Sequence, residues 1–175
     1  MRWVTFFSQT GTEILNLSKE LNIVPDVIIT NNSIESINTE YKNKKFFERL
    51  VFVSKKPSSS DYNNLLKIND TVTLHGWLRI VPEDICNAYS IYNLHPAPLT
   101  TYPFLKGKDP QKRTIELNLE YGGSTIHKCS PVLDSGEILL ENLVDLKNRN
   151  NDEKNKLIYK SSFELWKAFL KARFC

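Results

Sequence analysis

The sequence lacks the features that mark a membrane protein, a disulfide framework or a metal centre. No apolar run approaches the roughly 20 residues needed to cross a bilayer, so we expect no membrane-spanning segment. The three cysteines are odd in number and far apart, which predicts reduced thiols and neither a zinc site nor a redox centre. The N-terminal stretch MRWVTFF has one cation and a short apolar run, unlike a secretory signal. We therefore expect a cytoplasmic protein with no bound metal.

The chain also has little net charge. The formal net charge is +3 at pH 7, and the basic residues are interleaved with acidic ones. This distribution predicts no nucleic-acid-binding surface, although an anionic small molecule could use a few of the cations. No internal repeat or low-complexity tract interrupts the chain. A length of 175 residues, with 41% hydrophobic and 25% charged residues, predicts a single globular domain over residues 1–175.

Short apolar runs alternate with amphipathic ones along the chain. Apolar runs and alternating patterns predict strands over residues 2–7, 25–31, 50–56, 71–81, 90–95, 123–130 and 136–144. Helical spacing predicts helices over residues 10–21, 58–68, 111–121 and 151–174, while residues 33–45 fit either a helix or a loop. This alternation predicts an α/β fold with a mostly parallel sheet, helices on both faces and a Rossmann-like N-terminal half.

Two of the predicted helices carry further local signals. Thr10 and Glu13 match a capping box at the start of the helix over residues 10–21. The C-terminal helix has one apolar stripe, formed by Phe163, Trp166, Phe169 and Leu170. We expect this stripe to pack on the sheet, and a homodimer contact is the alternative.

Two polar side chains precede a proline-rich turn. Asn93 and His95 are two residues apart in the predicted strand over residues 90–95, so they lie on the same face. Pro96 and Pro98 then force an extended exit. Functional groups gather at the carboxyl ends of parallel strands, and an amide and an imidazolium can both donate to a developing oxyanion. The pair is a candidate oxyanion site, with a structural or surface histidine as the alternative.

Several motifs follow one another in a characteristic order. Asn93-Leu94-His95-Pro96 is followed by Gly123-Ser124-Thr125-Ile126-His127 and then by Leu133-Asp134-Ser135-Gly136. The stretches FFSQTGTEIL and LHGWLRIVPEDI precede them. In this combination the chain resembles the folate-dependent formyltransferase family. That family includes glycinamide ribonucleotide transformylase, the catalytic domain of methionyl-tRNA formyltransferase and the amino-sugar N-formyltransferases. The resemblance covers about residues 2–145.

The resemblance implies transfer of a formyl group from 10-formyltetrahydrofolate to a primary amine. Asn93 and His95 would polarise the formyl oxygen during attack by the amine. Asp134 would keep His95 protonated and assist removal of the amine proton. This triad is chemically consistent, because a carboxylate near an imidazole favours the charged imidazolium. The resemblance assigns His127 a supporting role.

The resemblance also implies two binding regions. The family holds the pterin of the donor at the positions of Leu74, Arg79, Ile80 and Val81. The acceptor would bind at Gly11, Thr12 and Glu13, where a helix start favours a phosphate. Gln9 and Glu13 stand where the family often has glycine and asparagine, and the carboxylate of Glu13 opposes a phosphate. His75 has no family counterpart and is expected to be structural, and the cation-rich loop from Lys106 to Arg113 has no assigned role.

We expect glycinamide ribonucleotide to be the acceptor, because the chain is a bare catalytic domain that keeps a Gly-Thr entry into its first helix. An amino-sugar nucleotide is an alternative, since TIHKCSPVLDSGEIL resembles the sugar N-formyltransferases. A non-catalytic module that binds folate or a nucleotide is another, but intact Asn93, His95 and Asp134 argue against it. The sequence after the last helix is too short for the second barrel of methionyl-tRNA formyltransferase, so we do not expect a tRNA acceptor. The lack of an N-terminal regulatory domain argues against simple hydrolysis of the donor.

Overall fold

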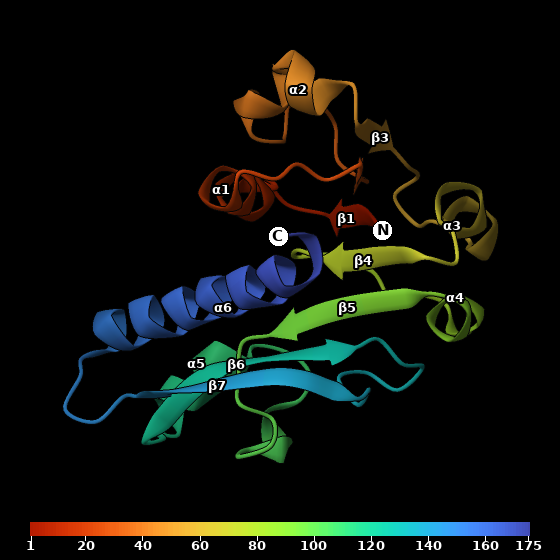
Figure 1. Ribbon diagram of the computed structural model, residues 1–175. Helices are drawn as coiled ribbons and strands as arrows, with labels where there is room; N and C mark the ends of the chain where they lie inside the picture. The colour runs from red at the N-terminus through yellow and green to blue at the C-terminus, as the bar shows by residue number, and fades with distance from the viewer. The chain divides into compact units, whose positions relative to one another are not determined.

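The computed structural model describes residues 1–175, which form two compact units. Unit 1 consists of Met1–Tyr92 with Phe174, and unit 2 consists of Asn93–Arg173 with Cys175. The fold is α/β, and its seven strands have the order β3-β2-β1-β4-β5-β6-β7 (Figure 1). Strand β5 (Ser90–His95) begins in unit 1 and ends in unit 2.

Unit 1 has the Rossmann-like arrangement that the sequence predicts. Its strands are β1 (Arg2–Phe7), β2 (Val27–Thr30), β3 (Leu50–Phe52) and β4 (Asp70–Leu74). Strand β1 pairs in parallel with β2 and β4, and β2 pairs in parallel with β3. The connecting helices are α1 (Thr12–Leu21), α2 (Lys44–Phe47), α3 (Ser59–Leu65) and α4 (Glu83–Ala88). Residues 33–45, which fit a helix or a loop by sequence, contain the 3-10 turn Thr39–Lys42 and the start of α2.

Strand β1 is covered on both faces, which explains its nearly unbroken apolar sequence. Phe7 belongs to a buried cluster with Ile14 of α1. Phe6 points to the opposite face, where its ring lies 5.4 Å from that of Tyr62 in α3, measured between centroids. The sequence of a parallel strand that is buried on both faces is typically a continuous apolar run.

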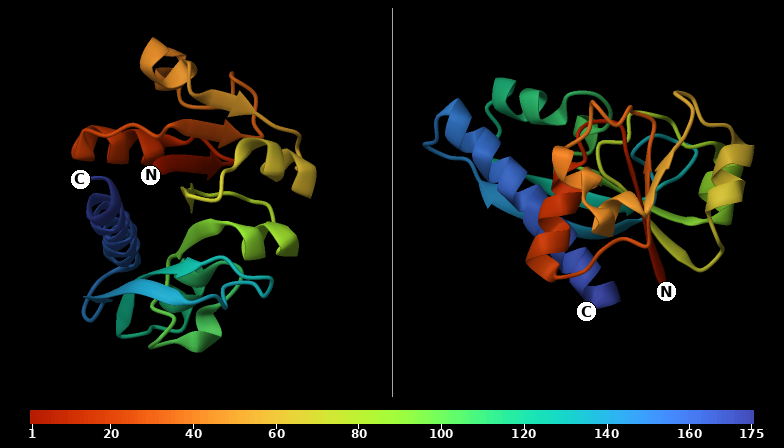
Figure 2. Two further views of the ribbon diagram at one scale, coloured as in Figure 1. Left: turned by 45° about the vertical axis from the view of Figure 1, so that its right-hand side comes forward. Right: turned by 90° about the horizontal axis from the view of Figure 1, so that it is seen from above.

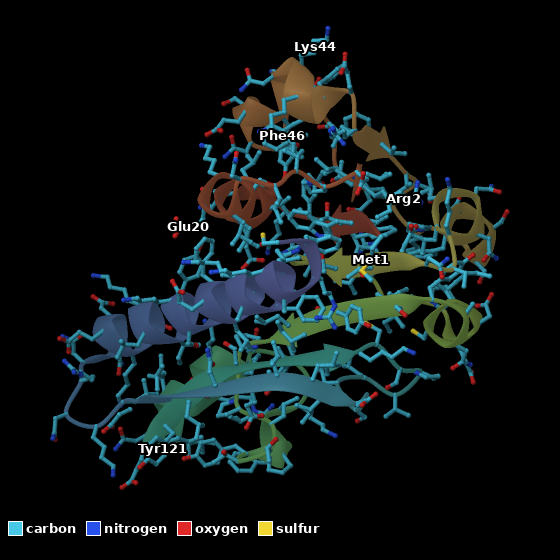
Figure 3. The ribbon with its side chains drawn as sticks, in the orientation of Figure 1. Met1, Arg2, Glu20, Lys44, Phe46 and Tyr121 are labelled. Atoms are coloured by element: carbon cyan, nitrogen blue, oxygen red, sulfur yellow. The ribbon has the colours of Figure 1, made fainter.

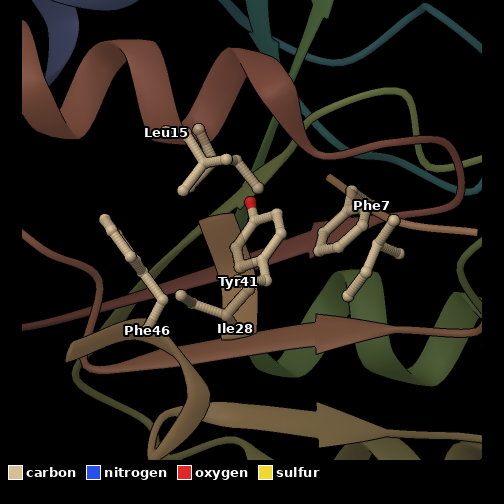
Figure 4. Close-up of a cluster of buried hydrophobic side chains, with 7 residues drawn as sticks. Phe7, Leu15, Ile28, Tyr41 and Phe46 are labelled. Atoms are coloured by element: carbon tan, nitrogen blue, oxygen red, sulfur yellow. The ribbon is translucent and has the colours of Figure 1, made fainter. Parts of the chain in front are cut away.

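A buried cluster beneath α1 ties the first loop of unit 1 to its core. Figure 4 shows the labelled side chains of Phe7, Leu15, Ile28, Tyr41 and Phe46 gathered around the Tyr41 ring. The Tyr41 hydroxyl donates to the carbonyl oxygen of Gly11 at 2.8 Å. Gly11 has φ 72°, and a Cβ there would lie 2.6 Å from the Tyr41 hydroxyl oxygen, so only glycine fits. Figure 3 shows Phe46 on the inner side of α2 and Lys44 on its outer side.

Unit 2 packs one long helix against an antiparallel strand pair. It contains the end of β5, β6 (Tyr121–Lys128), β7 (Ile138–Asp145), α5 (Pro110–Glu116) and α6 (Asn151–Phe174). Strands β6 and β7 are antiparallel, and α6 lies along them (Figures 1 and 2). Small residues on β6 allow this close approach: Ser124 Oγ lies 2.6 Å from Ser162 Oγ, and a Cβ at Gly122 would lie 2.8 Å from a side-chain carbon of Ile158.

The apolar stripe of α6 packs inside the protein. Trp166, Phe169 and Leu170 are buried, and Phe163 is half-buried. Burial of three of the four side chains agrees with the expectation that the stripe packs on the sheet. None of the helices is both long enough and apolar enough to span a membrane.

The predicted strand over residues 71–81 is too long. Strand β4 ends at Leu74, because Gly76 takes φ 63° and turns the chain. Beyond the turn, the Leu78 N–H donates to Ser8 Oγ at 3.0 Å instead of to a neighbouring strand. Residues 75–81 consequently form a loop at the carboxyl end of β4.

The capping box predicted at Thr10 and Glu13 is wrong. The residue that caps α1 is Gly11 in a left-handed conformation, with no side-chain cap. Thr10 Oγ1 lies 2.9 Å from Thr12 Oγ1, and the Glu13 carboxylate lies 2.7 Å from Nδ1 of His75. A buried tertiary partner therefore prevails over the local capping rule.

Replacement of Tyr41 by phenylalanine tests the link between the core and the first loop. The variant leaves the Gly11 carbonyl with only the long bond from the Leu15 N–H at 3.4 Å. We expect the free energy of unfolding to fall by about 1–2 kcal/mol, as measured by urea denaturation. Tyr159→Phe, at a side chain that is 56% exposed, is the control and should change it by less than about 0.5 kcal/mol. Equal stability of the two variants would contradict this account of the loop.

Candidate active site

His95 ends β5 and is buried, and both of its ring nitrogens face acceptors. Nε2 lies 2.8 Å from the carbonyl oxygen of Leu105, and Nδ1 lies 3.3 Å from Oδ2 of Asp134. A carbonyl oxygen can only accept, so Nε2 carries a hydrogen. A second proton on the ring therefore resides on Nδ1, beside the carboxylate. Asn93, two residues earlier on the same face of β5, is half-buried.

Asp134 lies in the turn after β6 and is buried between two imidazoles. Its Oδ2 faces His95 and accepts the N–H of Gly107 at 2.9 Å. Its Oδ1 lies 3.5 Å from Nε2 of His127, which has no closer hydrogen-bond partner. The other ring nitrogen of His127, Nδ1, lies 3.1 Å from the carbonyl of Lys128 and carries the hydrogen of that bond. No cluster of histidine, cysteine, aspartate and glutamate side chains in the protein, this one included, is arranged to hold a metal ion.

The glycines and the threonine of the motifs hold the backbone that carries these groups. A Cβ at Gly136 would lie 1.7 Å from the carbonyl oxygen of Lys128, so only glycine fits there. Gly123 has φ 147°, and a Cβ would lie 2.0 Å from a carbonyl oxygen of β7. The hydroxyl of Thr125 accepts the N–H of Leu99 at 3.0 Å and ties β6 to the segment after His95. The motif spacing therefore reflects backbone packing as well as chemistry.

The pKa values of the two acid–base groups both lie below their ordinary values, for different reasons. Burial is the largest influence on the pKa of His95 and lowers it below its ordinary value, although Asp134 and the Leu105 carbonyl raise it. Burial acts to raise the pKa of Asp134, but His127 and the Gly107 N–H, together with His95, outweigh burial and leave that pKa below its ordinary value. The low pKa of Asp134 favours its carboxylate form, and the low pKa of His95 favours the neutral ring. The family resemblance implies a protonated His95, a charge that Asp134 favours and burial opposes.

Unit 1 carries the residues expected to bind the donor. Leu74 and Val81 are buried, whereas Ile80 is 84% exposed on the loop after β4. The guanidinium of Arg79 donates to the carbonyl oxygen of Lys55 at 2.5 Å and so anchors the loop. The loop therefore presents an apolar side chain beside main chain that is not part of a strand.

Gly11, Thr12 and Glu13, the residues predicted to bind the acceptor, form the start of α1. Glu13 is held by His75, whose Nδ1 lies 2.7 Å from its Oε2 and whose Nε2 lies 2.9 Å from Oγ1 of Thr73. His75 is buried and hydrogen-bonded, in agreement with the expected structural role. The pair places a carboxylate at a helix end that would otherwise favour an anion.

Three groups of the site carry no side-chain signal in the sequence. Leu105 and Lys128 contribute carbonyl oxygens to the two histidines, and Gly107 contributes its N–H to Asp134. Any residue could supply the carbonyl oxygens, and any residue other than proline could supply the N–H. The only signal was the glycine in the cation-rich loop, whose φ of 86° shows that the chain turns there.

The chain is similar to proteins of known activity over nearly its whole length. The model of the formyl transferase family matches residues 9–169, which include parts of both units. A phosphoribosylglycinamide formyltransferase from Streptococcus pneumoniae is 19% identical with a TM-score of 0.77, and the match covers 99% of each chain. The enzyme of that name from Campylobacter jejuni is 18% identical with a TM-score of 0.80, over 100% of this chain and 98% of that one. The one from Anaplasma phagocytophilum is 20% identical with a TM-score of 0.79, over 98% and 85%. At these identities the structures establish the shared fold.

Titration of His95 tests the electrostatics of the site. We expect its pKa to lie below the ordinary value of 6.5. In Asp134→Asn it should fall further, because the carboxylate raises it. The measurement is an NMR titration of the imidazole ring protons, which is simple in a chain with only three histidines. A higher His95 pKa in the variant would contradict the geometry.

Proposed function

Because the chain belongs to the formyl transferase family, whose members use folate-derived formyl donors, we propose that it transfers the formyl group of 10-formyltetrahydrofolate to a primary amine. Glycinamide ribonucleotide is the first candidate acceptor, in line with the names of the similar structures. The observation that carries the proposal is the buried pair of Asp134 and His95, 3.3 Å apart, beside Asn93. This is the arrangement that proton transfer coupled to attack on a carbonyl requires.

The proposed reaction needs one proton to leave the amine and one to reach the departing nitrogen. The amine nitrogen attacks the formyl carbon, a new C–N bond forms, and the formyl oxygen becomes negative. Asn93 donates its amide hydrogen to that oxygen. Asp134 takes a proton from the amine, and Nδ1 of His95 holds it. The bond between the formyl carbon and N10 then breaks, and N10 leaves with a proton from this pair, which gives tetrahydrofolate and the formamide.

We assign donor binding to the loop after β4 in unit 1. Ile80 exposes an apolar side chain, and Arg79 fixes the loop through the Lys55 carbonyl. The main chain of residues 79–81 can pair with the edge of a flat heterocycle, since pockets for such ligands combine an apolar lining with a few placed polar groups. Leu74 and Val81, which are buried, support the loop from the core.

A second candidate is N-formylation of an amino-sugar nucleotide, and Glu13 is the observation that favours it. Two unit charges about 5 Å apart repel by roughly 3 kcal/mol at an effective dielectric near 20. A carboxylate held by His75 at the start of α1 therefore disfavours a phosphate at that helix end. The same carboxylate can accept hydrogen bonds from sugar hydroxyls.

Asp134→Asn is the direct test of the proposed mechanism. We expect the rate of tetrahydrofolate release to fall by about 10²- to 10⁴-fold with folding intact, because the variant loses the group that takes the amine proton. Asp152→Asn, at an exposed carboxylate in the first turn of α6, is the matched control and should retain its activity. Turnover in Asp134→Asn equal to that of the control would rule out this mechanism.

The acceptor is tested by comparing glycinamide ribonucleotide with its dephosphorylated riboside in the wild type and in Glu13→Asn. If the loop reads phosphate, Glu13→Asn should raise the preference for the phosphorylated acceptor, measured as the ratio of kcat/KM values, by about tenfold or more. Glu48→Asn, at an exposed carboxylate of the same unit, should leave the ratio unchanged. Equal activity on both acceptors in both proteins would show that the loop does not read phosphate and would favour an amino sugar.

A further inference from the structure

The segment Phe104–Gly107, here called the strap, contacts the catalytic pair through its main chain. The carbonyl oxygen of Leu105 accepts from Nε2 of His95 at 2.8 Å, and the N–H of Gly107 donates to Oδ2 of Asp134 at 2.9 Å. The strap thus bonds both members of the pair within three residues. A small displacement of this segment would change both contacts together.

Arg113, in α5, holds the strap on either side of the Leu105 carbonyl. Its Nη1 donates to the carbonyl oxygen of Lys106 at 2.9 Å, and its Nη2 donates to that of Phe104. The guanidinium is planar and presents its donors in a fixed fork, so it can hold two carbonyls at once, whereas an ammonium is a point charge. The side chain of Leu105 is fully buried, which anchors the strap from the core.

The Leu105 carbonyl determines which ring nitrogen of His95 can accept a proton. The carbonyl oxygen needs a donor, so in neutral His95 the hydrogen lies on Nε2. Nδ1 then has a lone pair that faces Asp134. The carboxylate by itself favours the opposite tautomer, with the hydrogen on Nδ1 and donated to Asp134. The strap must therefore be held firmly enough to impose the tautomer that the carboxylate disfavours. In the imposed form, Nδ1 can accept a proton, and in the other form it cannot.

We propose that Arg113 is a positioning residue for formyl transfer, which acts through the strap to keep neutral His95 in the Nε2–H tautomer. The proposed function supplies the reaction, but the effect on the tautomer does not depend on the acceptor. Lys106 reinforces the same arrangement, because its Nζ donates to Oγ of Ser135, the residue after Asp134. Burial is the main cause of the low pKa of His95, and the charge of Arg113 adds to this effect.

The test is ¹⁵N NMR of the imidazole nitrogens in the intact protein, at a pH above the titration of His95. The variants are Arg113→Gln, Arg113→Lys and, as the control, Arg149→Gln at an exposed arginine of the same unit. In the wild type and the control we expect the Nε2–H tautomer of His95. In Arg113→Gln we expect a large population with the hydrogen on Nδ1. Arg113→Lys should show an intermediate population, because it keeps the charge but not the fork.

Turnover is measured on the same samples, after urea denaturation has shown that each variant folds. We expect kcat to fall about 10- to 100-fold in Arg113→Gln with a smaller change in KM, because a catalytic group has been misplaced while binding is kept. An unchanged tautomer in Arg113→Gln would overturn the proposal whatever the activity. If that variant does not fold, an unchanged tautomer in Arg113→Lys would overturn it instead. The two proposals can fail separately. If the wild type formylates neither glycinamide ribonucleotide nor an amino-sugar nucleotide, the proposed reaction is wrong. A shifted tautomer in the Arg113 variants would still support the role of the strap.

Discussion

A carboxylate buried between two imidazoles is the constraint on which unit 2 depends. An isolated buried carboxylate costs several kcal/mol, so Asp134 needs partners that are held in place. The N–H of Gly107 donates to it at 2.9 Å. His95 and His127 face its two oxygens at 3.3 and 3.5 Å, and each imidazole has its other nitrogen bonded to a backbone carbonyl. The end of β5, the end of β6 and the strap must therefore fold together before the carboxylate can remain ionised.

The side chains of this site could be predicted from the sequence, but the groups that orient them could not. Asn93 and His95 share a face because strand side chains alternate, and Asp134 followed from motif spacing and a family resemblance. The Leu105 carbonyl and the Gly107 N–H belong to the main chain, so no residue type points to them. Arg113 looks like one cation among several in the loop, and its bonds to two carbonyls depend on how the loop folds.

Most of the fold could also be predicted from the sequence, and some of the wrong predictions have a related cause. Most strands and helices with strong periodicity lie near their predicted positions, but the short helix α4 was missed, and α5 and β3 end about four to five residues before their predicted ends. Two further errors have a structural explanation. Glu13 has the spacing of a capping residue, yet it bonds to His75, 62 positions away. The apolar sequence over residues 71–81 predicts one strand, but the turn at Gly76 ends β4 at Leu74.

The proposed catalytic groups and the proposed acceptor loop lie in separate parts of the chain. In unit 2, Gly123 and Gly136 match the family motifs, and close backbone contacts leave room for no other residue at either position. Departures from the family pattern fall at the start of α1 in unit 1, where Gln9 and Glu13 replace the usual glycine and asparagine. Backbone packing constrains the first set, while in the second set Glu13 is held by a side-chain contact with His75. The proposed acceptor loop can therefore vary at Glu13 without disturbing the contact between Asp134 and His95.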